Sequence, residues 1–191
     1  MIFIKKTNTL RLTVTALLTA IAIVIPMVMP IKILIEPASF TLASHAPIFL
    51  AMFFSPGIAI AVSLGSAVGF LLASFPIVVV LRALSHVVFA YVGAKYLVNR
   101  REQVLRSPLK STIFSLLIGC LHGAAEMLVV SMFFFGLIPG SSYSEGFFLA
   151  VFLLVGVGTI IHSMVDFLIS QFVWTSLGSR VQSLAKRIEN K

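Results

Sequence analysis

Six apolar stretches occupy most of the chain and constrain its fold more than any other feature. A helix needs about 20 consecutive apolar residues to cross the hydrocarbon core of a bilayer. Such stretches run through approximately residues 11–29, 40–54, 57–73, 76–98, 109–135 and 147–175. The second is short and contains Pro47, so we expect it to be broken or partly buried in protein. We predict an all-α integral membrane protein, with six transmembrane helices in a single membrane domain covering residues 1–191.

The composition excludes the soluble alternatives. Hydrophobic residues make up 59% of the 191 residues and charged residues 10%, whereas a soluble domain has about 45–50% and about 25%. Disorder is excluded as well, because it requires low hydrophobicity and high net charge. The first apolar stretch is longer than the roughly 7–15 residues of a signal-peptide core, and more stretches follow it. We therefore expect residues 1–30 to remain in the mature protein.

The basic residues predict the orientation in the membrane. All of the 14 Lys and Arg residues except Lys32 and Arg82 fall on one side of a six-span protein. Cytoplasmic loops carry such an excess, so we expect both termini in the cytoplasm. The net charge of +8 is divided among short segments without a nucleic-acid motif, which argues against a nucleic-acid partner. Residues 177–191 have apolar side chains at helical spacing among cations, as in a helix that lies in the cytoplasmic interface.

Three pairs of polar residues interrupt the last three apolar stretches. An ionisable side chain inside a membrane helix costs about 2.5–3.5 kcal/mol, so each needs a partner or a function. A spacing of four residues places both members of a pair on one face of their helix. The pairs are Arg82 with His86, His122 with Glu126, and His162 with Asp166.

The rise of a helix gives the expected depth of each pair. At about 1.5 Å per residue, Arg82, His86 and Glu126 lie roughly 9, 15 and 14 Å below the outer ends of their helices. They share the outer half of the membrane. The same count puts His162 and Asp166 deeper, at roughly 22 and 28 Å, unless their helix starts later. For these two we favour a structural role in which they bind each other.

Several readings of the outer residues remain open. Arg82 could form an internal ion pair with Glu126, bind a ligand, or do both. His86 and His122 could be neutral imidazoles bonded to carbonyl groups, or ligand contacts. We expect no metal site, because carboxylate-bridged metal bundles use Glu-x-x-His, which is absent. We also expect no catalytic residues and no cofactor, because neither a His-Glu-x-x-His motif nor a nucleophile with an adjacent base is present.

Two loops on the outer side could cover a binding site. Ile31, Ile33 and Ile35 alternate with other residues in the first loop, which indicates a short extended segment or a lid. Lys32 and Glu36 carry its charges, and Ser44 and His45 follow it at the mouth of the second stretch. The second loop, residues 136–146, is rich in Gly and Ser and is a candidate for a second gate.

Small residues mark faces where another helix can approach. Ala16 and Ala20 lie four apart in the first stretch, and Gly65 and Gly69 have the same spacing in the third. Small residues at this spacing allow two helix backbones to come close. The partner could be another helix of this chain or a separate membrane subunit.

Taken together, these features resemble the substrate-binding S component of energy-coupling factor (ECF) transporters. The resemblance covers essentially the whole chain and rests on length, six spans, Ala16-x-x-x-Ala20 and the segment from Ser44 to Pro56. It implies a plasma membrane protein that binds a vitamin in an outward-facing pocket formed by the first loop and the last three helices. It also implies that Ala16 and Ala20 dock on a coupling subunit (EcfT) driven by two ATPases (EcfA and EcfA'). The candidate pocket residues are Arg82, His86, His122, Glu126, Lys32, Ser44 and His45.

The residues favour a small anionic vitamin as ligand. The guanidinium of Arg82 is a planar fork of donors suited to a carboxylate, and Lys32 could assist from the loop. Trp174, the only tryptophan, is expected at the inner end, which argues against thiamine-like or flavin ligands. We place pantothenate ahead of nicotinate. The alternative is a self-sufficient proton-coupled carrier that uses His122, Glu126, His162 and Asp166 as a relay, although no inverted repeat is evident.

Overall fold

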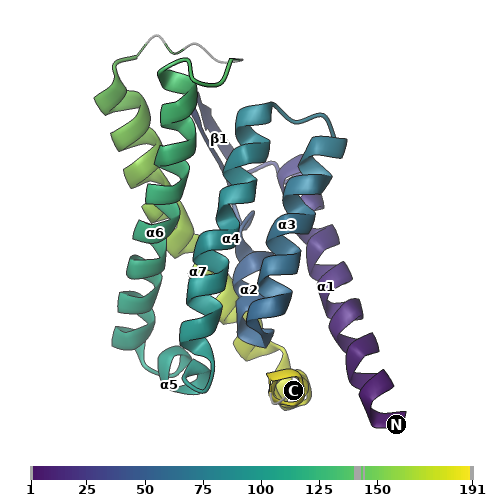
Figure 1. Cartoon of the computed structure of the whole chain (residues 1–191). Coiled ribbons are helices and arrows are strands. Elements are labelled where there is room, and N and C mark those ends of the chain that lie inside the picture. The colour runs from purple at the N-terminus through teal and green to yellow at the C-terminus, as the bar shows by residue number, and fades with distance from the viewer. Residues whose placement is uncertain (1, 140–142, 144, 190–191) are drawn as a thin grey trace.

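The computed structural model describes residues 2–139, 143 and 145–189, which form long helices that run side by side (Figure 1). The central part of the second predicted gate, residues 140–142 and 144, lies outside the described residues, as do the last two residues of the tail. The helices and strands follow the order α1, β1, β2, α2, α3, α4, α5, α6, η1, α7 and α8.

Long apolar helices confirm the prediction of a helical membrane protein. Four helical segments are long and apolar enough to cross a bilayer, namely Asn8–Val28, Ile77–Leu97, Pro108–Phe134 and Phe148–Ser176. They belong to α1 (Ile2–Val28), α4 (Ile77–Leu97), α6 (Pro108–Phe134), and the π-helix η1 (Phe148–Val157) with α7 (Gly158–Ser176). Helix α3 (Pro56–Leu72) is shorter, with 17 residues. The third to sixth predicted stretches thus begin and end within a few residues of observed helices.

The second predicted stretch, residues 40–54, is wrong in its first part. Its opening residues belong to a strand and a turn, and the helix that follows, α2 (Ala46–Phe54), has only nine residues. At about 1.5 Å per residue such a helix is too short to cross a bilayer. Most of its side chains are buried, as expected for a stretch enclosed in protein. Pro47 lies in its first turn, where a missing backbone N–H costs nothing.

A β-hairpin separates α1 from α2 in this otherwise helical protein. Strands β1 (Lys32–Ile35) and β2 (Ala38–Thr41) pair antiparallel, with Ile33 opposite Phe40. Their β-branched residues favour extended backbone, and Pro37 in the turn cannot continue a helix. Strand β1 is exposed and β2 is partly buried. The expected extended segment is therefore the outer strand of a hairpin, which lies at the end of the molecule opposite both termini (Figure 1).

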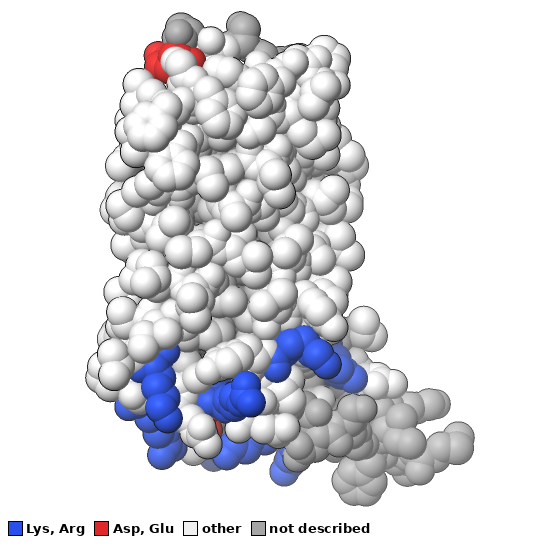
Figure 2. Space-filling model, turned by 60° about the vertical axis from the view of Figure 1, so that its left-hand side comes forward, with Lys and Arg blue, Asp and Glu red and all other residues white. Residues whose placement is uncertain are grey.

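The other end of the molecule is basic. Lys and Arg side chains gather there on the face shown in Figure 2, whereas the middle of that face is uncharged. Both termini lie at this end, with α5 (Arg101–Leu105) and α8 (Gly178–Glu189). Helix α8 appears end-on in Figure 1 and so crosses the direction of the long helices, with Ala185 and Ile188 buried. The predicted helix in the tail is confirmed for these residues.

Close helix contacts depend on glycine. A Cβ at Gly69 of α3 would lie 2.2 Å from the Ile23 side chain of α1. A Cβ at Gly123 of α6 would lie 2.8 Å from the backbone oxygen of Gly156 in η1. For these glycines the close approach is therefore within the chain. Ala16 and Ala20, in contrast, are exposed on α1.

An aromatic core fills the space between α2, α4 and α7. The Phe49 ring lies 5.5 Å from that of Phe89 and 5.4 Å from that of Phe167. Toward the basic end, the Phe53 ring lies 5.4 Å from that of Trp174. The polar residues in the half of the molecule away from the basic end pack against this aromatic core.

Candidate functional site

Glu126 of α6 binds polar side chains from two other helices. Its Oε2 accepts hydrogen bonds from Arg82 Nη2 of α4 at 2.9 Å and from Thr159 Oγ1 of α7 at 2.6 Å. Its Oε1 lies 3.2 Å from His86 Nε2. Arg82 and Glu126 are 6% and 2% exposed. A buried carboxylate needs such charge-assisted bonds to offset its loss of hydration. The ion pair between Arg82 and Glu126, one of the readings left open from the sequence, is therefore present.

Asp166 of α7 holds the turn that leads into α2. Its Oδ1 accepts a hydrogen bond from the backbone N–H of Ala43 at 2.8 Å, and its Oδ2 accepts one from the N–H of His45 at 2.8 Å. His45 Nδ1 and His162 Nε2 lie 3.1 and 3.3 Å from Oδ2. The Ser44 hydroxyl lies 3.1 Å from His162 Nε2. A single buried carboxylate thus fixes the backbone and two imidazoles at the mouth of α2.

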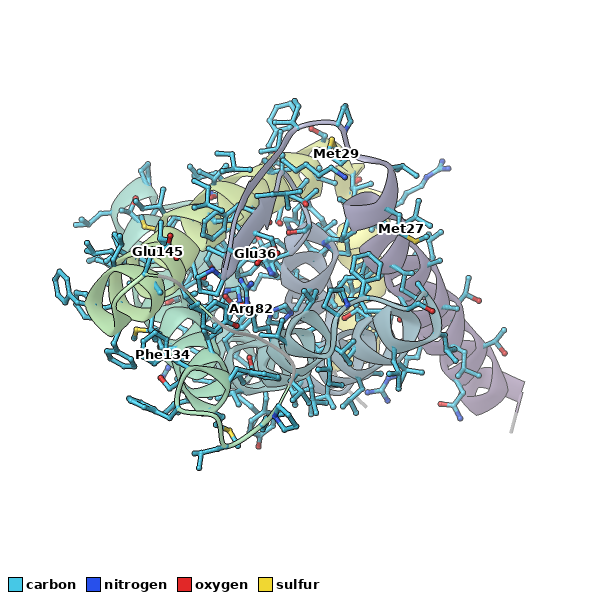
Figure 3. The ribbon with its side chains drawn as sticks, turned by 90° about the horizontal axis from the view of Figure 1, so that it is seen from above. Met27, Met29, Glu36, Arg82, Phe134 and Glu145 are labelled. Atoms are coloured by element: carbon cyan, nitrogen blue, oxygen red, sulfur yellow. The ribbon has the colours of Figure 1, made fainter. Side chains whose placement is uncertain are left out.

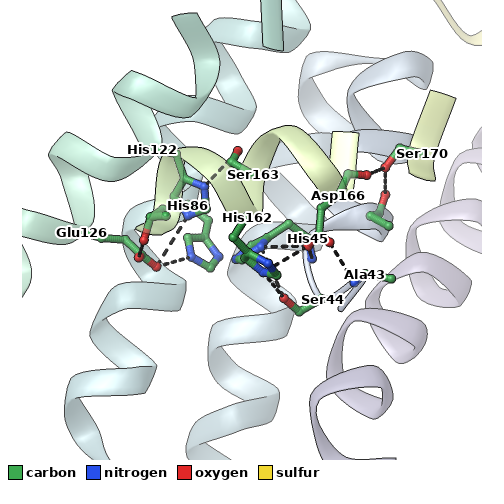
Figure 4. A network of polar contacts seen from close by, with 12 residues as sticks. Ala43, Ser44, His45, His86, His122, Glu126, His162, Ser163, Asp166 and Ser170 are labelled. Atoms are coloured by element: carbon green, nitrogen blue, oxygen red, sulfur yellow. Dashed lines mark hydrogen bonds and ion pairs between the residues drawn. The ribbon is translucent and has the colours of Figure 1, made fainter. Parts of the chain in front are cut away.

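The four histidines meet between these two carboxylates (Figure 4). The His45 ring centroid lies 4.7 Å from those of His86 and His122, and 5.0 Å from that of His162. His86 and His122 are 4.8 Å apart. Because each comes from a different helix or turn, their convergence is a product of tertiary packing. We call these four histidines with Glu126 and Asp166 the histidine cluster.

The hairpin covers the histidine cluster. Arg82 Nη1 donates to the backbone oxygen of Pro37 in the hairpin turn at 3.1 Å, and the Phe40 ring lies 5.4 Å from that of His162. Seen from above, Arg82 lies within the group of helices near Glu36 of the hairpin (Figure 3). The cluster is closed in this structure. Access from the hairpin end of the molecule therefore requires the hairpin to move.

The structure brings most of the predicted residues together. Six of them share the contacts described above: Arg82, His86, His122, Glu126, Ser44 and His45. Lys32 does not join them, since it is exposed on β1.

The depths predicted from the sequence placed His162 and Asp166 away from these residues, but the structure brings them into contact. His162 and Asp166 bind each other, as expected, but both also contact His45 or Ser44. Their helix, η1 with α7, spans 29 residues. At about 1.5 Å per residue that helix is longer than the roughly 30 Å hydrocarbon core, so counting from its outer end overestimates depth.

Two hydroxyl groups were missed from the sequence. Thr159 bonds Glu126, and Ser163 Oγ lies 3.3 Å from His122 Nδ1. Thr159 and Ser163 lie four residues apart on one face of α7. His162 and Asp166 lie three and seven residues after Thr159 and belong to the same polar stripe. This spacing is the helical one. A search for hydroxyl residues on the same face as ionisable ones finds both.

Comparison with known proteins gives one curated relative that covers most of the chain. The niacin transporter NiaX of Lactococcus lactis subsp. cremoris (strain MG1363) is 40% identical over 164 residues, which are 85% of this chain and 72% of that protein. No family model matches the chain. No solved structure matches it.

Proposed function

The chain belongs to the family of the niacin transporter NiaX, and from this relation we propose that it is a substrate-binding S component that captures nicotinate. It is a multi-pass plasma membrane protein, with four helices long and apolar enough to span. One structural observation carries the proposal. Arg82 is buried and donates a hydrogen bond to the turn of the hairpin above it, so this hairpin can act as a lid.

The proposed topology has six membrane segments, of which α2 is enclosed by the others, and both termini in the cytoplasm. The distribution of charge supports it, because cytoplasmic surfaces are rich in Lys and Arg and the basic end holds both termini. In this orientation the hairpin and the histidine cluster face the outside. The vitamin would then enter from the outer surface.

The proposed ligand is nicotinate, which replaces the pantothenate that we placed first from the sequence. The related transporter is a niacin transporter, and nothing in that relation favours pantothenate. The guanidinium of Arg82 would bind the carboxylate once the hairpin releases it from Pro37. Phe40 and Phe89, which both lie against histidine rings, would pack on the pyridine ring.

Transport requires partners under this proposal. The chain would bind the vitamin without catalysis of its own. The resemblance to S components implies that these partners are a coupling subunit (EcfT) and two ATPases (EcfA and EcfA'). The exposure of Ala16 and Ala20 on α1 supports docking at that face.

Calorimetry on the purified chain tests the proposed ligand. We expect nicotinate to bind more tightly than pantothenate or nicotinamide, because nicotinamide lacks the carboxylate. Arg82→Lys keeps the charge but loses the fork, and we expect it to weaken binding at least tenfold. Lys32→Ala is the control, and we expect it to change the affinity less than twofold because Lys32 is exposed.

Two results would overturn the proposal. Equal affinity for nicotinamide and nicotinate would remove Arg82 as the carboxylate site. Uptake by the chain alone in proteoliposomes, driven by a pH gradient, would instead support the proton-coupled carrier.

A further inference from the structure

The inner part of the histidine cluster has the donors of a transition-metal site. His45, His86, His122 and Glu126 each offer one ligating atom, and these atoms all lie within 4.8 Å of one another. In a tetrahedral zinc site with bonds of about 2.1 Å, neighbouring ligand atoms are about 3.4 Å apart. Small side-chain rotations therefore suffice to close the set around one ion. Imidazole nitrogens with one carboxylate suit zinc and its neighbours in the first transition row.

His122 points to a ligand independently of this spacing. It is fully buried, and its Nε2 has no hydrogen-bond partner among the described residues. Buried polar atoms are rarely left without a partner, because the loss of hydration is then not offset. This nitrogen lies 3.5 Å from Glu126 Oε1, the oxygen that His86 Nε2 also approaches at 3.2 Å. A metal ion bound among these three atoms would be coordinated by His122 Nε2.

Two of the histidines make the second contact that is typical of metal-binding imidazoles. Metal-binding imidazoles commonly donate their second N–H to a carboxylate or another acceptor. His45 Nδ1 lies 3.1 Å from Asp166, and His122 Nδ1 lies 3.3 Å from the Ser163 hydroxyl. With Nδ1 as the donor, Nε2 of each ring carries the lone pair that a metal needs. Oε2 of Glu126 is held by Arg82 and Thr159, which leaves Oε1 for the ion.

The charge of the site also favours a divalent cation. Arg82 neutralises one of two buried carboxylates, so Glu126 and Asp166 leave one negative charge when the imidazoles are neutral. Nicotinate would bring a second. Buried charges that are not compensated are strongly unfavourable. One divalent ion cancels both.

We propose that His45, His86, His122 and Glu126 bind one divalent transition-metal ion of the zinc class, and that this ion promotes the binding of the anionic vitamin. The ligand set departs from our expectation of no metal, because that expectation considered spacing within single helices and these ligands come from separate segments. The second part rests on the proposed function, whereas the first part does not.

Titration of chelator-stripped protein with ZnCl₂ tests the metal site. The protein should carry an affinity tag without histidine, so that the tag adds no ligands. We expect one zinc ion per chain, no binding of MgCl₂, which prefers oxygen ligands, and the visible absorption of tetrahedral cobalt with CoCl₂. His122→Gln should weaken zinc binding at least tenfold. Ser131→Ala on the same helix, where the hydroxyl bonds the local Met127 carbonyl, is the control and should retain zinc binding.

The outcomes separate the two parts. Absence of stoichiometric zinc and of a cobalt spectrum in the unaltered protein would overturn the metal site whether or not a variant folds. Equal loss in both variants would also overturn the assigned ligands. Nicotinate affinity that rises at least tenfold with ZnCl₂ supports the coupling, and equal affinity with and without ZnCl₂ overturns it. If nicotinate binds in neither state, the proposed function fails while the zinc titration still decides the metal site.

Discussion

Glu126 shows how single residues survive inside an apolar bundle. It lies four residues from His122 on α6, and this local spacing places both on one helix face. Its three closest polar partners outside α6, in contrast, come from α4 and α7. Removing one partner of a buried ion pair leaves an uncompensated charge and costs about 3–5 kcal/mol. Arg82 and Glu126 therefore stabilise the fold as a pair, and a role in ligand binding is compatible with this.

Thr159→Val tests the contribution of one buried hydrogen bond to stability. The change keeps the shape of the side chain but removes a 2.6 Å hydrogen bond to the Glu126 carboxylate. Hydrogen bonds to charged groups contribute about 1.5–3 kcal/mol, so we expect thermal unfolding in detergent at a clearly lower temperature. Thr175→Val is the matched control on α7, since its hydroxyl bonds only a local carbonyl and its side chain is exposed. Equal midpoints for the two variants would contradict the assigned bond.

The hairpin is the element that decides access. Its turn accepts a hydrogen bond from Arg82, and Phe40 of β2 packs against His162. Gly158 allows this seating, because a Cβ there would lie 2.5 Å from the Phe40 ring. The residues of β1 are exposed and make few contacts with the helices. Strand β2, in contrast, places Ala38 and Phe40 in an apolar cluster with Val130 and Val155, so opening of the hairpin must break these contacts as well.

Phe40→Ala tests the hairpin as a lid. The variant loses ring contacts, and an aromatic pair contributes about 0.5–1.5 kcal/mol, so we expect nicotinate to dissociate roughly three- to tenfold faster. Leu34→Ala, on the exposed strand of the same hairpin, should leave the rate unchanged. Dissociation of radiolabelled nicotinate from the purified protein measures both. Equal rates for Phe40→Ala and the unaltered protein would show that the hairpin does not retain the vitamin.

At the scale of the whole molecule, the two ends and one helix have different tasks. The basic end faces the cytoplasm in the proposed topology. Arg101 stabilises this end by donating to the Phe53 carbonyl and lying 5.2 Å from the Trp174 ring. The opposite end carries the hairpin and the cluster. Helix α1 is mostly exposed along its membrane span, so it is the face most open to another membrane subunit.

Ala16→Leu with Ala20→Leu tests that face. Both alanines are exposed, so the larger side chains leave nicotinate binding intact but block close approach of a partner helix. We expect vitamin uptake by cells to fall at least tenfold. Ala124→Leu makes the same change at an exposed alanine of α6 and should spare uptake. Full uptake by the double variant would place the docking surface elsewhere.

The sequence by itself determined the properties that depend on local composition and spacing. Apolar length predicted six spans, of which four match helices long and apolar enough to cross a bilayer, and the basic segments marked one end of the molecule. The polar spacing on the last three helices singled out Arg82, His86, His122 and Glu126, which the structure brings into contact. These inferences succeed because burial in lipid or protein acts on each helix separately.

Only the tertiary structure decided how those helices meet. It replaced the first part of the second stretch by a hairpin, brought His162 and Asp166 to His45, and left Lys32 at the surface. Helix length alone does not fix the relative heights of neighbouring helices. Those heights come from close contacts such as that between Gly123 and Gly156, which no periodicity within one helix reveals.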